Sequence, residues 1–272
     1  MKNDLGQQDL TQTAFTINIA DLIYRIEPLF QSTSYFCKNY LASGDPDIRI
    51  SITKDEIIQE EKRGKIFFYT CEEYIGGSLD RRIINRRINE NCIETVVLFR
   101  KVIEASLAFD TFFLHGAVIA LEDSAYMFTA PSGTGKTTHI MKWIKALNKT
   151  YVVNGDKPLI KIMGSQVMAC GTPWCGKENM GKNTMVPLRA IIYMERAENN
   201  HIEEINFPQI YPNILQETYL PDDPEKAKKT LDLLSQLYEK VRFYKFKCNN
   251  FKDDCFDVAY NALVGSCRPD VS

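Results

Sequence analysis

A short glycine-rich segment between an apolar run and an amphipathic run constrains this chain more than any other feature. Residues 130–138 read Ala-Pro-Ser-Gly-Thr-Gly-Lys-Thr-Thr. They follow the apolar run 125–129 and precede residues 138–147, whose apolar side chains recur at helical spacing. Glycines let successive backbone N–H groups point inward at an anion, and the N-terminus of the following helix adds positive potential. The pattern predicts a strand, a phosphate-binding loop and a helix.

This glycine-rich loop (residues 130–138) is predicted to bind ATP. Lys136 would place a positive charge between the β- and γ-phosphates, and the Thr137 hydroxyl would ligate Mg²⁺. Ala130 stands where the usual pattern has its first glycine, a position that needs little side-chain volume. The predicted nucleotide-binding residues are Ser132, Gly133, Thr134, Gly135, Lys136, Thr137 and Thr138.

A carboxylate is expected opposite this loop. The next apolar run, residues 151–154, ends in Gly155, Asp156 and Lys157. One helix and a return strand fill the distance from Lys136, so Asp156 should emerge at the C-terminal end of a strand beside the loop, where ligands bind in α/β sheets. Asp156 is therefore predicted to ligate Mg²⁺ or to accept a proton from a hydroxyl.

The charge balance argues against two classes of partner. The chain has 272 residues, 33 of them basic and 35 acidic, for a net charge of −2. This balance predicts neither nucleic acid nor an anionic membrane as a partner. Residues 1–10 are polar and no run approaches the ~18 apolar residues of a membrane span, so a cytosolic protein is expected.

The eight cysteines are scattered and include no CxxC pair. In a reducing compartment this pattern predicts free thiols. No zinc site is expected, because further ligands at the usual spacing are lacking.

The chain is expected to divide at residues 92 and 93. Residues 1–92 would form an accessory α+β subdomain, with strands at 15–19, 48–52 and 66–69 and a charged face at Arg81, Arg82, Arg86 and Arg87. Residues 93–272 would form the catalytic domain. Its predicted elements are helices at 94–110, 138–147, 224–238 and 254–263 and strands at 112–121, 125–129, 151–154, 190–194 and 241–246, with a hairpin turn at 122–124.

Residues 112–200 resemble a known family. His115-Gly116 on a strand, the glycine-rich loop and then Asp156 look like the C-terminal domain of HPr kinase/phosphorylase. The loop alone also resembles that of ATP-dependent phosphoenolpyruvate carboxykinase. The segments 171–177 and 186–190 resemble uncharacterised bacterial proteins of the same superfamily.

The chain departs from the HPr kinase pattern at two positions. HPr kinase has two adjacent aspartates, of which Gly155 replaces the first, so that catalysis would rest on Asp156. The other departure is Thr138, which stands where that family has an acidic residue and disfavours the phosphorylase direction.

The resemblance implies a P-loop α/β (α+β) fold with a mixed, largely antiparallel sheet, together with ATP and a divalent metal. It also suggests a homo-oligomer, since HPr kinase is a hexamer. By the same resemblance His115 would face the phosphate, although a histidine on an apolar strand is as commonly a core residue.

Further candidates lie after residue 168. Lys177 is predicted to stabilise the transferring phosphoryl group. Trp174 would stack on the nucleotide or pack in the core, and Arg189 or Arg196 could reach a phosphate. His139 is expected on the helix surface.

These residues support three hypotheses. The first is a kinase that transfers the γ-phosphate to a hydroxyl, either a serine of a protein or peptide or a small molecule, with Asp156, Lys136, His115 and Lys177 as catalytic residues. The second is an ATP-binding regulatory module without transfer activity. The third is an ATP-dependent carboxykinase, which would need further arginines and a second metal.

Overall fold

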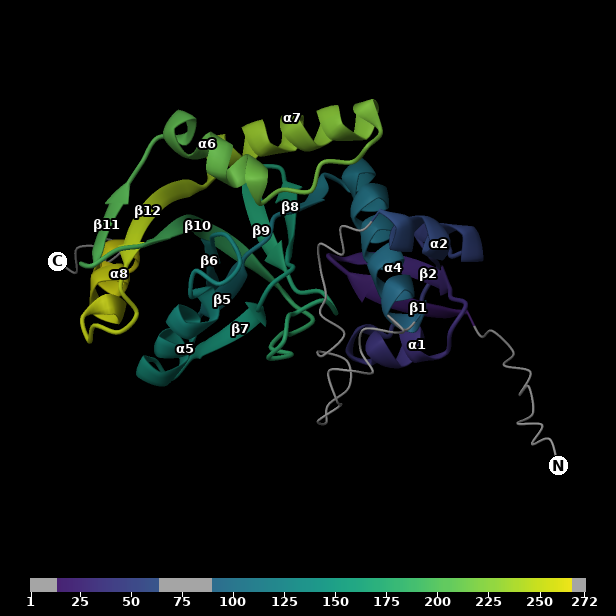
Figure 1. Cartoon of the computed structure of the whole chain (residues 1–272), viewed down its shortest axis with the longest axis horizontal. Helices are drawn as coiled ribbons and strands as arrows, with labels where there is room; N and C mark the ends of the chain where they lie inside the picture. The colour runs from purple at the N-terminus through teal and green to yellow at the C-terminus, as the bar shows by residue number, and fades with distance from the viewer. Residues whose placement is uncertain (1–13, 64–89, 266–272) are drawn as a thin grey trace. The chain divides into compact units, whose positions relative to one another are not determined.

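The structure is a computed structural model that describes residues 14–63 and 90–265. The chain divides into two compact units, Met1–Val102 and Ile103–Ser272 (Figure 1). This division falls inside helix α4 (Glu90–Ser106), whereas the sequence placed the boundary near the beginning of that helix.

The first unit is a small α+β structure. Strands β1 (Phe15–Ile19) and β2 (Leu22–Glu27) form an antiparallel hairpin, and β3 (Ile48–Ser51) pairs parallel to β2. Helices α1 (Ser32–Phe36) and α2 (Lys54–Lys62), the 3₁₀ turn η1 (Lys38–Tyr40) and most of α4 complete the described part. The predicted strands at 15–19 and 48–52 are confirmed. The strand predicted at 66–69 and the arginines predicted as a charged face lie outside the described residues.

A buried carboxylate anchors α4 in this unit. Glu94 is fully buried, and its carboxylate accepts hydrogen bonds from the backbone N–H groups of Leu29 and Phe30 and from the Thr33 hydroxyl. Burial raises the pKa of Glu94 more than these hydrogen bonds lower it. The side chain thus satisfies two half-buried backbone donors just before α1 and the buried Thr33 hydroxyl within it.

Replacing Glu94 with alanine should destabilise this anchor by about 2–3 kcal/mol, because the buried Thr33 hydroxyl and two half-buried backbone N–H groups lose their acceptor. Amide hydrogen exchange at Leu29 and Phe30 should then accelerate by about 30- to 100-fold, since ~1.4 kcal/mol corresponds to a factor of ten. Glu61→Ala, at an exposed position of α2, is the matched control and should leave these amides unchanged. Unchanged exchange in Glu94→Ala would contradict the anchoring role.

The second unit contains one mixed sheet. Its order is β4-β8-β9-β10-β6-β5-β7, and β12 pairs with β10 and β11. Among the described strands of this sheet, only the β10–β6 and β10–β12 pairs are parallel, so the mixed and mostly antiparallel sheet expected from the resemblance is confirmed. The strands are β4 (Thr111–Phe113), β5 (Ala117–Leu121), β6 (Ser124–Thr129), β7 (Thr150–Asn154), β8 (Leu159–Met163), β9 (Gln166–Cys170), β10 (Met185–Arg196), β11 (His201–Glu204) and β12 (Arg242–Cys248).

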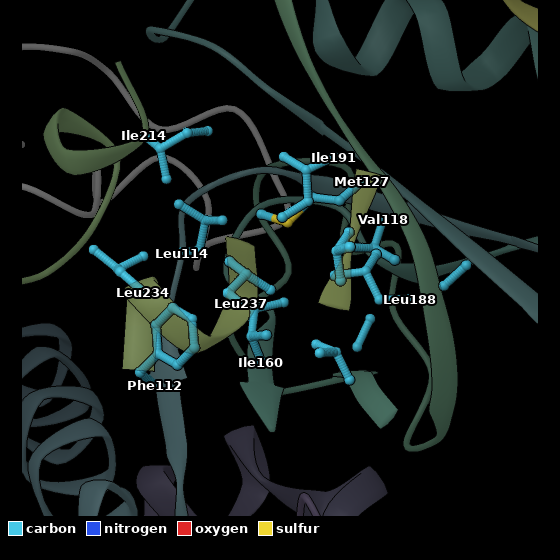
Figure 2. Close-up of a cluster of buried hydrophobic side chains, with 14 of the residues drawn as sticks. Phe112, Leu114, Val118, Met127, Ile160, Leu188, Ile191, Ile214, Leu234 and Leu237 are labelled. Carbon is cyan, nitrogen blue, oxygen red and sulfur yellow. The ribbon is translucent and has the colours of Figure 1, made fainter. Parts of the chain in front are cut away.

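Helices cover both faces of this sheet. Helices α6 (Phe207–Gln216) and α7 (Pro224–Lys240) pack on one face, where Val118 and Met127 point (Figures 1 and 2). Helices α5 (Lys136–Ala146) and α8 (Cys255–Leu263) pack on the other face, where Ile119 and Phe128 point. Strands buried on both faces read as continuous apolar runs, which is why residues 117–121 and 125–129 show no alternation.

The strand directions position three segments at one edge of the sheet. Strand β5 lies between β6 and β7 and is antiparallel to both. The C-terminal ends of β6 and β7 therefore meet the beginning of β5. The sequence predicted one strand over 112–121. Instead, β4 and β5 are separate strands, and His115 and Gly116 lie in the break between them.

Candidate functional site

The glycine-rich loop connects β6 to α5, so the predicted strand, loop and helix are confirmed as secondary structure. Gly133 and Gly135 have φ values of 79° and 112°, a region that strains any residue with a Cβ. Gly135 is the N-cap of α5. The Thr134 N–H and hydroxyl both donate to the Pro131 carbonyl, at 3.3 and 2.8 Å. Among the predicted binding residues, Ser132, Gly133 and Thr138 are exposed, and Thr134, Gly135 and Thr137 are half-buried.

The Lys136 side chain folds back into this loop. It is only 8% exposed, and its Nζ donates to the Ala130 carbonyl at 2.7 Å. Burial lowers the pKa of Lys136, and the carboxylates of Glu217 and Asp156 partly oppose this effect. The ammonium group is therefore held inside the loop and within electrostatic range of two carboxylates.

A side-chain turn fixes Asp156 at the end of β7. Asn154 Oδ1 accepts hydrogen bonds from the backbone N–H groups of Asp156 and Lys157, at 2.9 and 2.6 Å. The Gly116 N–H donates to the Asp156 carbonyl at 3.0 Å, which ties the turn to the beginning of β5. Gly116 also allows close packing on β6, because a Cβ there would lie 2.8 Å from the Phe128 carbonyl oxygen. Asp156 therefore emerges at a strand end, as predicted, with β5 between its strand and the loop strand.

His115 lies between two carboxylates. Its Nε2 is 3.0 Å from Asp156 Oδ1, and its Nδ1 contacts Glu217 Oε2. A neutral imidazole carries one N–H, so both contacts are satisfied only when His115 is protonated. Burial lowers the pKa of His115, but the hydrogen bonds to Asp156 and Glu217 outweigh burial and raise it above its ordinary value. The two carboxylates thus favour the imidazolium form of His115 at the sheet edge.

This pKa shift predicts how stability depends on pH. Because the folded-state pKa of His115 exceeds its unfolded value of about 6.5, its stabilising contribution is complete below about pH 6.5 and is lost as pH rises through the folded-state pKa. We expect the difference in unfolding free energy between the wild type and His115→Gln to be largest near pH 6 and to shrink by about pH 9. Denaturant titration of both proteins, in a buffer that contains a chelator, measures this difference at each pH. A difference that grows with pH would contradict the assignment.

Two further charged residues belong to the cluster. Glu217 is the C-cap of α6, and its backbone carbonyl accepts from the His115 N–H at 2.8 Å. Lys157 is 2% exposed, and its Nζ pairs with Asp156 Oδ2. Burial raises the pKa of Asp156, but the hydrogen bond from His115 and the charge of Lys157 outweigh it and hold the pKa well below its usual range.

Neither residue has a predicted role in the site. Glu217 lies 102 positions from His115, in a segment without a recognisable motif. Lys157 directly follows Asp156 in the sequence but belongs to no motif.

The segment 171–181 packs against Asp156. A Cβ on Gly176 would lie 3.0 Å from the Asp156 Cβ, and one on Gly155 would lie 2.7 Å from the Cys175 carbonyl oxygen. Lys177 is the next residue and is exposed, so it lies in a segment beside the cluster, and its catalytic role stays a prediction. Trp174 is fully buried, which favours the packing alternative over stacking on a nucleotide.

Arg196 and Arg189 occupy different positions on β10. The Arg196 guanidinium donates to the Gly133 carbonyl, so it contacts the glycine-rich loop. Arg189 contacts the Ser124 hydroxyl at 3.3 Å, at the far end of β6. Only Arg196 of this pair is near the candidate site.

The prediction that His139 lies on the helix surface is wrong. The side chain is fully buried and packs against the rings of Phe128 and Phe246. The first turn of α5 presents this face to the sheet rather than to solvent, so a position directly after Thr138 in that turn does not make His139 a surface residue.

Comparison with known proteins assigns no family to this chain. The sequence matches no protein-family model and no curated protein. Among solved structures, the HPr(Ser) kinase/phosphatase from Coxiella burnetii is 11% identical, with a TM-score of 0.34 over 57% of this chain and 97% of that chain. Similarity at this level assigns neither a family nor a function.

No helix in residues 14–63 and 90–265 is long and apolar enough to cross a membrane. The six described cysteines are free thiols, as expected.

Proposed function

We propose that the protein is an ATP- and Mg²⁺-dependent kinase that transfers the γ-phosphate to a hydroxyl, either a serine of a protein or peptide or a hydroxyl of a small molecule. The observation that carries this proposal is the meeting of the Lys136 ammonium with the His115–Asp156 pair at one sheet edge. We further propose that the second unit has the P-loop core of the HPr kinase type and that the protein acts in the cytosol.

The chemistry of the loop suits a polyphosphate. Its two glycines carry the positive φ values that an inward-facing backbone requires, and no atom beyond the chain neighbours lies within 4 Å of the position of a Cβ on Gly133. Lys136 and Arg196 add positive charge at the base and the side of the loop. The helix N-terminus at Gly135 adds a further positive potential. These groups would bind the phosphates and stabilise the charge that develops on the transferring group.

The hydroxyl oxygen of Thr137 and the carboxylate of Asp156 are the donors that Mg²⁺ prefers, and the bound ion would neutralise phosphate charge. His115 and Lys157 keep Asp156 ionised, so its carboxylate is ready to act as a ligand or a hydrogen-bond acceptor.

The acceptor hydroxyl would be oriented by Asp156 and would transfer its proton to an Asp156 oxygen. A carboxylate of low pKa suffices, because the transition state of phosphoryl transfer is loose and the nucleophile loses its proton late. In its imidazolium form, His115 would stabilise that carboxylate and the adjacent phosphoryl oxygens. Lys177, in the neighbouring exposed segment, would reach the same group from the acceptor side.

The test uses two probes, because the acceptor is unidentified. Calorimetry with a non-hydrolysable ATP analogue and magnesium chloride measures binding. Radiolabelled ATP with a pool of single-serine peptides, a matched alanine pool and a set of small polyols measures transfer. We expect micromolar binding and label on a hydroxyl-bearing acceptor only. Binding without transfer to any acceptor would instead indicate the regulatory module. Release of carbon dioxide that depends on oxaloacetate would indicate the carboxykinase. An absence of binding would overturn the nucleotide assignment itself.

A further inference from the structure

Two cysteines and a histidine meet in the core outside the candidate site. Cys248 ends β12, Cys255 begins α8, and His139 lies on α5. The two sulfur atoms are 3.3 Å apart, and Cys255 Sγ is 3.4 Å from His139 Nδ1. All three side chains are buried. Such a group could hold a soft metal ion or act as a thiol pair, and the hydrogen bonds around it distinguish these uses.

The histidine tautomer disfavours a metal ion. The Trp143 indole N–H donates to His139 Nε2 at 3.0 Å, so Nε2 carries the lone pair. The ring proton is then on Nδ1 and points at Cys255 Sγ. A metal at Nδ1 would need the lone pair there, and it would leave an N–H at Nε2 facing the indole N–H. Metal-bound histidines instead donate their second N–H to an acceptor.

The same hydrogen bonds favour a thiol pair in which Cys255 is the thiolate. Cys255 Sγ accepts from His139 Nδ1–H and lies against the Cys248 thiol, which can donate to it. The hydrogen bond from Cys248 and the contact with His139 lower the pKa of Cys255 despite its burial. A thiolate beside a second thiol is the arrangement from which disulfides form.

Asn250 connects this pair to the glycine-rich loop. Its Oδ1 lies 3.4 Å from both sulfur atoms, and its Nδ2 donates to the Gly135 carbonyl at 3.1 Å. The contact is close, because a Cβ on Gly135 would lie 2.5 Å from Asn250 Nδ2. The orientation of the Asn250 amide therefore depends on the Cys248 thiol on one side and the N-cap of α5 on the other.

We propose that Cys248 and Cys255 are a site of reversible oxidation by a peroxide to an intramolecular disulfide, and that oxidation weakens polyphosphate binding through Asn250. The Cys255 thiolate attacks a peroxide oxygen to give a sulfenic acid and hydroxide or alkoxide. The Cys248 sulfur then displaces water from Cys255, with loss of its own proton, and the S–S bond forms. Two thiols lose two electrons, and the peroxide O–O bond is reduced.

With Cys255 as the thiolate, the Cys248 S–H is the remaining thiol proton, shared between Cys255 Sγ and Asn250 Oδ1, and oxidation removes it. The amide must then turn toward another donor, and its hydrogen bond to Gly135 weakens. Both cysteine side chains are buried, so neighbouring residues must move before a peroxide reaches the sulfur atoms. This loop-coupled half of the proposal rests on the proposed nucleotide binding, whereas disulfide formation does not.

The first experiment is independent of nucleotide binding. The full chain is treated with hydrogen peroxide, the remaining thiols are alkylated and the peptides are mapped by mass spectrometry. We expect a Cys248–Cys255 crosslink that dithiothreitol reverses, and the same crosslink in Cys37→Ala, which changes a buried thiol of the first unit. Persistence of two free thiols while other cysteines oxidise would overturn the proposal. So would binding of one equivalent of Zn²⁺ that protects both thiols.

The second experiment tests the coupling. The affinity for a non-hydrolysable ATP analogue is compared before and after oxidation, and we expect it to fall about fivefold or more in the wild type. Asn250→Ala should still form the disulfide but show equal affinities in both states, and Cys248→Ser should not respond to peroxide. A crosslink with unchanged affinity in the wild type would refute the coupling. Absence of binding in the reduced protein would instead count against the proposed function.

Discussion

Replacing Lys136 with methionine is expected to lower kcat/KM for phosphoryl transfer by about 10²- to 10³-fold, the effect of removing one preorganised charge from a transition state. Methionine keeps the length and apolar stem of the side chain, so the buried path beneath the loop stays filled. The buried Ala130 carbonyl loses its 2.7 Å donor, so a loss of stability of about 1–3 kcal/mol is expected beside the kinetic effect. Steady-state kinetics with Mg²⁺ and ATP measure the loss.

Lys145→Met is the matched control, since it lies on the same helix but is exposed in the last turn. It should retain wild-type kinetics. If Lys136→Met matched the control in both binding and transfer, the glycine-rich loop would not be the phosphate site, and the kinase proposal would fail with it.

Replacing Asp156 with asparagine should separate binding from transfer. The amide keeps the shape of the side chain but lacks the charge that pairs with Lys157 and His115. Transfer is expected to fall by about 10²- to 10⁴-fold, the range for a positioned proton acceptor, while binding of magnesium-free nucleotide changes little. The unfolding free energy should fall by about 2–3 kcal/mol, because a buried lysine loses its carboxylate.

Asp232→Asn, at an exposed position of α7, controls for the loss of one negative charge from the second unit. It should change neither kinetics nor stability. Equal losses of nucleotide binding and transfer in Asp156→Asn would point to misfolding. Retention of full transfer would show that Asp156 only stabilises the sheet edge.

Local patterns predicted the elements that surround the loop. The apolar pattern of residues 125–129 and of residues 138–147 was sufficient to predict β6 and α5. The glycines between them marked the loop that joins the two elements. Helix α6 was not predicted, because it begins at the Asn206 cap with a proline inside and is recognisable mainly through its packing on the sheet. The break at His115 and Gly116 was also missed, since both strands it separates are equally apolar.

The candidate site was only partly predictable for a related reason. Asp156 could be placed because one helix and one strand separate it from the loop, a distance over which chain geometry is constrained. Glu217 and the contact between Asn250 and Gly135 depend on how distant segments pair, which no local pattern encodes. His139 shows the opposite error. Its position in the first turn of the helix led to the expectation of an exposed side chain, whereas its contacts with Trp143 and Cys255 lie in the core.

The wide spacing of the charged cluster along the chain has a kinetic consequence. His115 meets Glu217 across 102 positions, and Gly135 meets Asn250 across 115. Contacts at such separation require large loops to close before they gain any stabilisation, so this unit should fold slowly, in milliseconds to seconds. A nascent chain released before α6 would carry the complete glycine-rich loop yet leave His115 with a single acidic neighbour, and the charged cluster would assemble only after synthesis has passed Glu217.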